Sequence, residues 1–155
     1  PCVGDYFVDR STRVFHVGRL DADTEGLLLL TNDGELSNRL THPKYAVDKT
    51  YIATVREISN QVLGALTLGV ELDDGPAAAN SARIISRTKN AVMIELVIHE
   101  GRNRIVRRMF DAVEAPVTAL ARTRFGPIHL GQQKPGSIRP ITGPELRSLY
   151  TAAGL

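Results

Sequence analysis

The chain has 155 residues, of which 43% are hydrophobic, enough for a domain with a substantial core. Charged residues make up 23%, which argues against global disorder, and no apolar run approaches the roughly 18 residues that a membrane-spanning helix needs. The single cysteine, Cys2, excludes an intramolecular disulfide and favours a reducing, cytoplasmic compartment.

The first half of the chain is predicted to consist of short elements separated by tight turns. In chain order we expect a strand at 14–17, a strand at 27–31, a helix at 33–40 and a strand at 50–55. The leucine-rich strand at 27–31 should be buried on both faces. Asp33 can cap the following helix through its side chain.

The second half alternates amphipathic helices with longer strands, and its turn residues indicate hairpins. Predicted in order are a helix at 60–68, strands at 82–88 and 91–98, a helix at 103–113, a strand at 117–125 and a helix at 142–153. Strands outnumber helices and several connections are short. The fold class is therefore predicted to be α+β with a mixed, mostly antiparallel sheet.

Residues 1–13 read as loop, and the chain starts with Pro1 rather than an initiator methionine. No repeat, heptad or low-complexity segment divides the sequence. We expect one domain over residues 1–155, cut on its N-terminal side.

Basic charge is concentrated in residues 101–124, where six arginines face two acidic residues, a net charge of +4 within a chain of net charge +2. In the predicted helix, Arg104, Arg107 and Arg108 fall within about 100° of one another, opposite the apolar side. Such a face is typical of polyanion binding, although a solvated basic surface is the alternative.

Asp21 lies on a short loop between two predicted strands, a rigid place from which a carboxylate can act. A lone loop aspartate is more often a turn or cap residue. Asp23 lies two positions away, and a carboxylate pair leaves glycosidase chemistry open.

Lys49 and Tyr51 share one face of the predicted strand, where a cation and a ring could hold a phosphate and stack on a base. A half-buried tyrosine with a solvated hydroxyl is the alternative. The four histidines are scattered, and there is no Walker A, G-x-G-x-x-G or G-x-S-x-G motif. We therefore expect neither a metal nor a nucleotide cofactor.

Several specific segments follow one another in a fixed order. They are Val17–Asp21, Thr24–Gly34, His42-Pro43, Lys49–Tyr51, Glu100–Phe110 and Leu120–Gly126. Together they closely resemble the RsuA/RluB/RluE/RluF family of bacterial ribosomal RNA pseudouridine synthases. The resemblance implies the pseudouridine synthase catalytic fold and a cofactor-free isomerisation of a uridine in ribosomal RNA. It also implies that ribosomal RNA is the partner and that the protein does not bind a membrane.

The same resemblance assigns roles to residues. Asp21 resembles the catalytic aspartate, Tyr51 the tyrosine that packs against the target base, and Arg107 the basic residue that pairs with the aspartate. Expected substrate-binding residues are Arg19, Lys49, Arg102, Arg104, Arg108 and, as an apolar floor under the base, Leu120.

Two features depart from the family pattern. Many relatives have glutamine where this chain has Ile105. Relatives usually begin with an S4-type RNA-binding domain and a strand containing Lys-Pro-x-Gly, and this chain shows neither. An RNA-binding module without turnover, and a glycoside or N-glycosyl hydrolase that uses Asp21 with Asp23, stay open as alternative functions.

Overall fold

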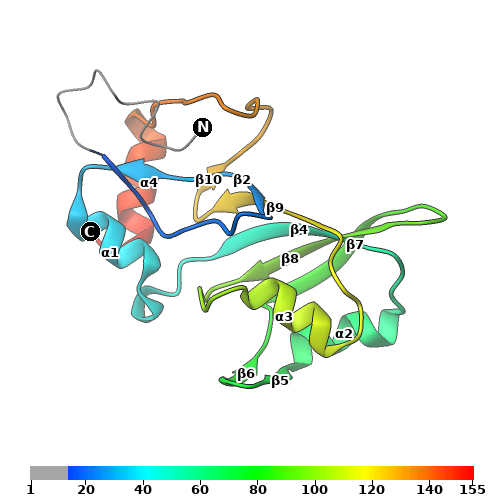
Figure 1. The fold of residues 1–155 in the computed structure, drawn as a ribbon. Coiled ribbons are helices and arrows are strands. Elements are labelled where there is room, and N and C mark those ends of the chain that lie inside the picture. The colour runs from blue at the N-terminus through cyan, green and yellow to red at the C-terminus, as the bar shows by residue number, and fades with distance from the viewer. Residues whose placement is uncertain (1–13) are drawn as a thin grey trace.

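The fold of this computed structural model is described for residues 14–155 and is built on a mixed sheet (Figure 1). Within that range the sheet has six strands. Their order is β10 (Ile128–His129), β9 (Ala119–Phe125), β4 (Lys49–Val55), β8 (Val92–Ile98) and β7 (Ser81–Arg87), with β2 (Glu25–Gly26) also on β9. Only the β2–β9 pair is parallel. The predicted α+β class with a mostly antiparallel sheet is confirmed.

Helices α2 (Asn60–Leu68) and α3 (Ile105–Ala112) cover one face of this sheet (Figure 1). Alternate residues of β4 and β8 point toward them, so Ala53 and Ile94 are fully buried in one cluster with Phe110 of α3. A hairpin of β5 (Val70–Leu72) and β6 (Gly75–Ala77) follows α2 and contacts α3. This cluster fixes the position of α3 relative to β4.

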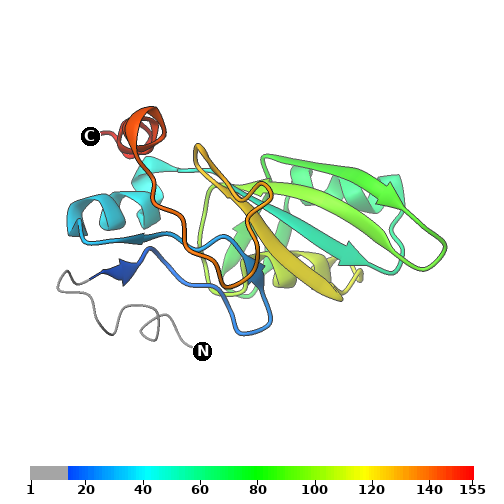
Figure 2. The ribbon, with the colours of Figure 1, turned by 90° about the horizontal axis from the view of Figure 1, so that it is seen from above.

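A second hydrophobic cluster lies toward the other end of the molecule, where the first and the last helix of the chain meet (Figures 1 and 2). The elements around it are β1 (Phe15–His16), β3 (Leu30–Thr31), α1 (Gly34–Thr41), the 3₁₀ turn η2 (Pro43–Tyr45) and α4 (Gly143–Ala152). Its buried side chains come from the segments beside β1 and β3 and before β4, from α1 and α4, and from the ends of β9 and β10: Val17, Leu27, Leu29, Leu36, Leu40, Val47, Phe125, Ile128, Leu149 and Ala153. Asp33 caps α1 by accepting hydrogen bonds from the Glu35 and Leu36 amides. Its other carboxylate oxygen accepts a 2.7 Å hydrogen bond from the Tyr150 hydroxyl, which joins α4 to α1.

Apart from the strand at 27–31, the predicted elements are confirmed to within two residues, whereas the short strands β2, β5, β6 and β10 were not predicted. The strand expected at 27–31 extends only over Leu30–Thr31, and the leucines alternate: Leu27 and Leu29 are buried, whereas Leu28 and Leu30 are half-buried. The reason is that the Leu27 amide donates to the Arg122 carbonyl oxygen, so this segment crosses from one sheet to another. The predicted helix at 103–113 begins at Ile105 because Arg104 has left-handed backbone angles.

The predicted loop at 1–13, including Cys2, lies outside the described residues. Among residues 14–155, no helix is long and apolar enough to cross a lipid bilayer. The cytoplasmic location stays a prediction.

Candidate active site

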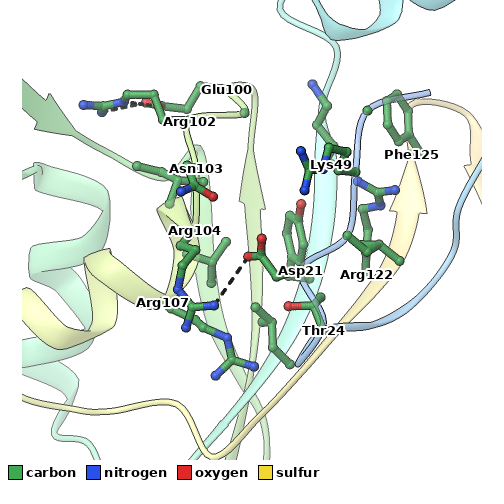
Figure 3. A pocket seen from close by; sticks show the side chains of 18 of the residues that line it. Asp21, Thr24, Lys49, Glu100, Arg102, Asn103, Arg104, Arg107, Arg122 and Phe125 are labelled. Atoms are coloured by element: carbon green, nitrogen blue, oxygen red, sulfur yellow. Dashed lines mark hydrogen bonds and ion pairs between the residues drawn. The ribbon is translucent and has the colours of Figure 1, made fainter. Parts of the chain in front are cut away.

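A pocket of about 490 Å³ opens where the Asp21 loop meets the ends of β4, β9 and α3 (Figure 3). The loop contributes Gly18–Asp21 and Thr24, and the segment before and within α3 contributes residues 100–107. The strands contribute Lys49, Tyr51, Leu120, Arg122 and Phe125. Lys49 and Tyr51 continue the row of β4 side chains that is buried under α3, so the core packing itself sets the geometry of the pocket.

The Asp21 loop is held in place by a close approach to β9. Gly26 pairs with Arg122 in the parallel β2–β9 ladder, and the Leu27 amide donates to the Arg122 carbonyl oxygen at 2.8 Å. A Cβ atom on Gly26 would lie only 2.1 Å from that carbonyl oxygen, and the residue has a φ of 110°. Only glycine fits both the space and the backbone angle.

Asp21 lies in the pocket with its side chain 33% exposed, and Arg104 Nη1 is 4.0 Å from its Oδ2 (Figure 3). Arg104 also binds Asp23 with two hydrogen bonds, at 3.2 and 3.3 Å. This bond to Arg104, supplemented by the charge of Arg107, lowers the pKa of the Asp23 carboxyl below its usual value. One guanidinium thus serves both carboxylates.

The ion pair expected between Arg107 and Asp21 is not the one formed. Arg107 Nη2 donates to the backbone oxygen of Asp23 at 2.6 Å, and its Nε lies 3.4 Å from Asp23 Oδ2. Arg104 takes the position beside Asp21 because its φ of 53° turns the chain just before α3. A left-handed non-glycine residue costs about 1–2 kcal/mol, and such strain is typical of functional sites.

The expected phosphate ligands Arg102 and Arg108 are engaged within the chain. Arg108 binds the Asp74 carboxylate at 2.8 and 3.1 Å, and Arg102 binds both Asp74 and Glu100. These bonds, first that from Arg108, lower the pKa of Asp74. Arg102 lines the pocket and Arg108 does not. The role of both in binding RNA stays a prediction. Within the chain, they attach the β5–β6 turn to α3 and to the segment before it.

Tyr51, Leu120 and Arg19 all line the pocket, as the expected roles require. Tyr51 is half-buried beside Leu120, which is buried in the core under α3. Arg19 is exposed at the rim.

Lys49 is buried, with 7% of its surface exposed, and its ammonium lies 5.2 Å from the centre of the Phe125 ring. Burial, and after it the neighbouring Arg122 charge, lower its pKa from 10.5 to about 8, against an opposing effect of Asp48. The predicted shared face of Lys49 and Tyr51 brings both side chains into the pocket.

Arg122 was not assigned a role from the sequence. It is 3% exposed, its Nε donates to the Leu27 carbonyl oxygen at 2.9 Å, and its guanidinium lies 5.0 Å from the Phe125 ring centre. A signal was present, because Leu120 and Arg122 are two positions apart on a strand and so share a face. A prediction that placed Leu120 in the pocket could have placed Arg122 there too.

Residues 14–155 contain no group of three or more histidine, cysteine, aspartate or glutamate side chains arranged to hold a metal ion.

The sequence matches the RNA pseudouridylate synthase family over residues 5–112, and the chain belongs to that family. It is 50% identical over its whole length to an uncharacterised RNA pseudouridine synthase of Mycobacterium tuberculosis. It is 44% identical, over 97% of its length, to ribosomal large subunit pseudouridine synthase B of Bacillus subtilis. The resemblance to the RsuA/RluB group is confirmed. The chain spans 63% of the length of each of these two relatives.

Solved structures show the same fold. A structure described as a crystal structure of pseudouridylate synthase superposes with a TM-score of 0.77 at 34% identity, covering 88% of this chain and 59% of that one. A structure of an H/ACA ribonucleoprotein bound to a substrate RNA gives a TM-score of 0.61 at 15% identity, covering 76% of this chain and 40% of that one. The second likeness is one of fold alone.

Proposed function

We propose that residues 1–155 form the catalytic domain of a ribosomal RNA pseudouridine synthase, with Asp21 as its catalytic carboxylate. The observation that carries the proposal is the position of Asp21: a rigidly held carboxylate in a pocket that also contains Tyr51 and Leu120. Family membership supports the reaction class, and the naming of the Bacillus subtilis relative supports ribosomal RNA as the substrate.

The reaction is an isomerisation that adds no atoms. The N1–C1′ bond of uridine breaks, the uracil turns, and a C5–C1′ bond forms while C5 loses a proton and N1 gains one. Because nothing is oxidised or reduced, the step needs no redox cofactor. It does need a carboxylate beside C1′, as nucleophile, as electrostatic partner of an oxocarbenium-like centre, or as base.

The residues around Asp21 suit these demands. Arg104 places a positive charge 4.0 Å from the carboxylate. Tyr51, which lines the same pocket, would pack on a flipped uracil and relay a proton. Leu120 supplies an apolar floor that would exclude water from the detached base. Flipping a nucleotide out of a loop costs a few kcal/mol, which contacts to RNA phosphates from the other pocket cations would offset.

The hydrolase alternative receives no support from Asp23. Its carboxylate is bonded to Arg104 and lies within 3.4 Å of Arg107 Nε, so it is not a free partner for Asp21. The non-catalytic binding module remains an outcome of the following experiment.

The test is pseudouridine mapping by mass spectrometry on ribosomal RNA that lacks the modification. Wild-type protein should form pseudouridine at a defined position, and Asp21→Asn should abolish it while RNA binding is kept. Asp73→Asn, at an exposed position in the β5–β6 turn, is the matched control and should be fully active. Turnover by Asp21→Asn would refute the role of Asp21, and wild-type binding without turnover would favour the binding module.

A further inference from the structure

Two buried cations lie next to each other at one side of the pocket. Arg122 is opposite Tyr51 in the β4–β9 ladder, and Lys49 is opposite Phe125, so all four side chains are on the same face of the sheet. The Lys49 ammonium and the Arg122 guanidinium both lie within about 5 Å of the Phe125 ring centre, at 5.2 and 5.0 Å. This arrangement holds two like charges together out of water.

Neither cation has an anionic partner among residues 14–155. Arg122 uses Nε to bind the Leu27 carbonyl oxygen, and its Nη2 is buried without any hydrogen-bond partner in that range. Lys49 makes no ion pair there, and Asp48 influences it only at longer range. Burying a charge without a partner costs several kcal/mol, and Nη2 is a donor that an unfilled site would leave unsatisfied.

The position of the pair shows which ligand could use it. Both residues line the pocket, and in Figure 3 they lie on the side away from Arg104 and Arg107, with Asp21 between the two groups. A phosphodiester carries one negative charge shared by two non-bridging oxygens, and each oxygen can accept a hydrogen bond from one of two adjacent cations. A uracil carbonyl oxygen is neutral in the substrate and matches such a pair less well.

We propose that Lys49 and Arg122 form a preformed subsite for a backbone phosphate next to the target nucleotide. The proposal rests on the proposed function in that it takes RNA as the substrate. The Phe125 ring keeps both side chains in place when the site is empty, and the phosphate completes the hydrogen bonding of Arg122 and offsets one of the two positive charges.

The test compares two probes of the same sequence. One is a pentauridylate with ordinary phosphodiester linkages, and the other carries neutral methylphosphonate linkages. Their dissociation constants are measured for the wild type, for Lys49→Met, for the charge-keeping Lys49→Arg, and for the control Lys89→Met. Lys89 is exposed in the turn between β7 and β8 and does not line this pocket.

We expect the wild-type preference for the charged probe to fall about tenfold in Lys49→Met, the size of one charge-assisted hydrogen bond. Lys49→Arg and Lys89→Met should keep it. An unchanged preference in Lys49→Met, or an equal loss in Lys89→Met, overturns the proposal. If Lys49→Met keeps the preference but slows single-turnover isomerisation, the pair acts on a uracil oxygen and the phosphate subsite is wrong.

Folding and function are separated by two further measurements. Each variant is first checked by its melting temperature, and Lys49→Gln replaces Lys49→Met if the latter does not fold. Binding is measured without turnover, so a protein that fails to form pseudouridine but shows the predicted probe preference refutes the proposed function and keeps the subsite. A protein that forms pseudouridine but lacks the predicted probe preference keeps the proposed function and refutes the subsite.

Discussion

The two sides of the pocket differ in whether their positively charged side chains have anionic partners. On the α3 side each arginine has a carboxylate partner: Arg104 and Arg107 share Asp23, and Arg102 and Arg108 share Asp74. On the β9 side, Lys49 and Arg122 are buried and uncompensated within residues 14–155. Among the cations of the pocket, Lys49 and Arg122 are therefore the two that are buried without an anionic partner in the described range.

The largest expected effect comes from separating the Asp21 loop from β9. Gly26→Ala would place a Cβ atom 2.1 Å from the Arg122 carbonyl oxygen, so the β2–β9 pair cannot stay as it is. We expect a loss of about 3 kcal/mol or more in the free energy of unfolding, measured by urea denaturation.

Gly64→Ala in α2 is the matched control, because nothing lies within 4 Å of its added Cβ atom. It should stabilise the protein by up to about 1 kcal/mol through its better helix propensity. Equal stability of the two variants would show that the close approach at Gly26 does not hold the loop.

The next effect is the pH-dependent cost of burying Lys49. Its pKa of about 8 lies below the usual 10.5, so below about pH 8 the side chain is charged in both folded and unfolded protein and the full penalty applies. Between about pH 8 and 10.5 the unfolded chain binds more protons than the folded one, so stability rises with pH. A shift of this size corresponds to about 3 kcal/mol.

Lys49→Met removes this titration. It should be more stable than the wild type below about pH 8, and the difference should shrink as pH rises toward 10.5. Urea denaturation of both proteins at several pH values measures the stability difference and its change with pH. A constant difference across that range would mean that Lys49 is not buried in its charged form, which would weaken the contrast between the two sides.

A smaller effect is expected from removing the anion on the α3 side. Asp23→Asn takes away the carboxylate that Arg104 and Arg107 share, which leaves more positive charge on this side of the pocket. We expect binding of single-stranded RNA to become a few-fold tighter at low salt, with a salt dependence steeper by up to about 0.7 in log–log slope. Asp73→Asn, which removes the same charge away from the pocket, should change neither.

The smallest effect concerns Asp74, which is half-exposed and holds Arg102 and Arg108. Asp74→Asn should lower the melting temperature slightly and raise KM about twofold, because the segment before α3 loses one attachment while kcat needs no contact from Asp74. Steady-state kinetics on ribosomal RNA check this. A large fall in kcat with unchanged KM would contradict a purely positioning role.

Local signals in the sequence were enough for much of the fold. The hairpin of β7 and β8 and the helix at 60–68 follow from alternation, turn residues and apolar spacing, each of which acts over a few positions. The leucine run was misread because its burial depends on β9, about 95 residues later. Arg104 was placed on the helix because left-handed backbone angles leave no trace in helical periodicity.

The site was predictable to a similar degree. The sequence brought Asp21, Tyr51 and Leu120 to attention, and the structure places all three in one pocket. It could not assign ion-pair partners, because Asp23 and Asp74 reach the arginines only through tertiary packing. For the same reason Arg122 became visible only once β4 and β9 were paired.

The parallel β2–β9 pair also has a consequence for protein engineering. Main-chain hydrogen bonds join the Asp21 loop to the strand that carries Leu120 and Arg122, so the smallest transplantable piece of this site is discontinuous in the chain. A graft of the loop alone would bring the carboxylate without the backbone that orients it. A designer who wishes to move this chemistry to another scaffold must copy a two-strand unit with a glycine at the crossing point.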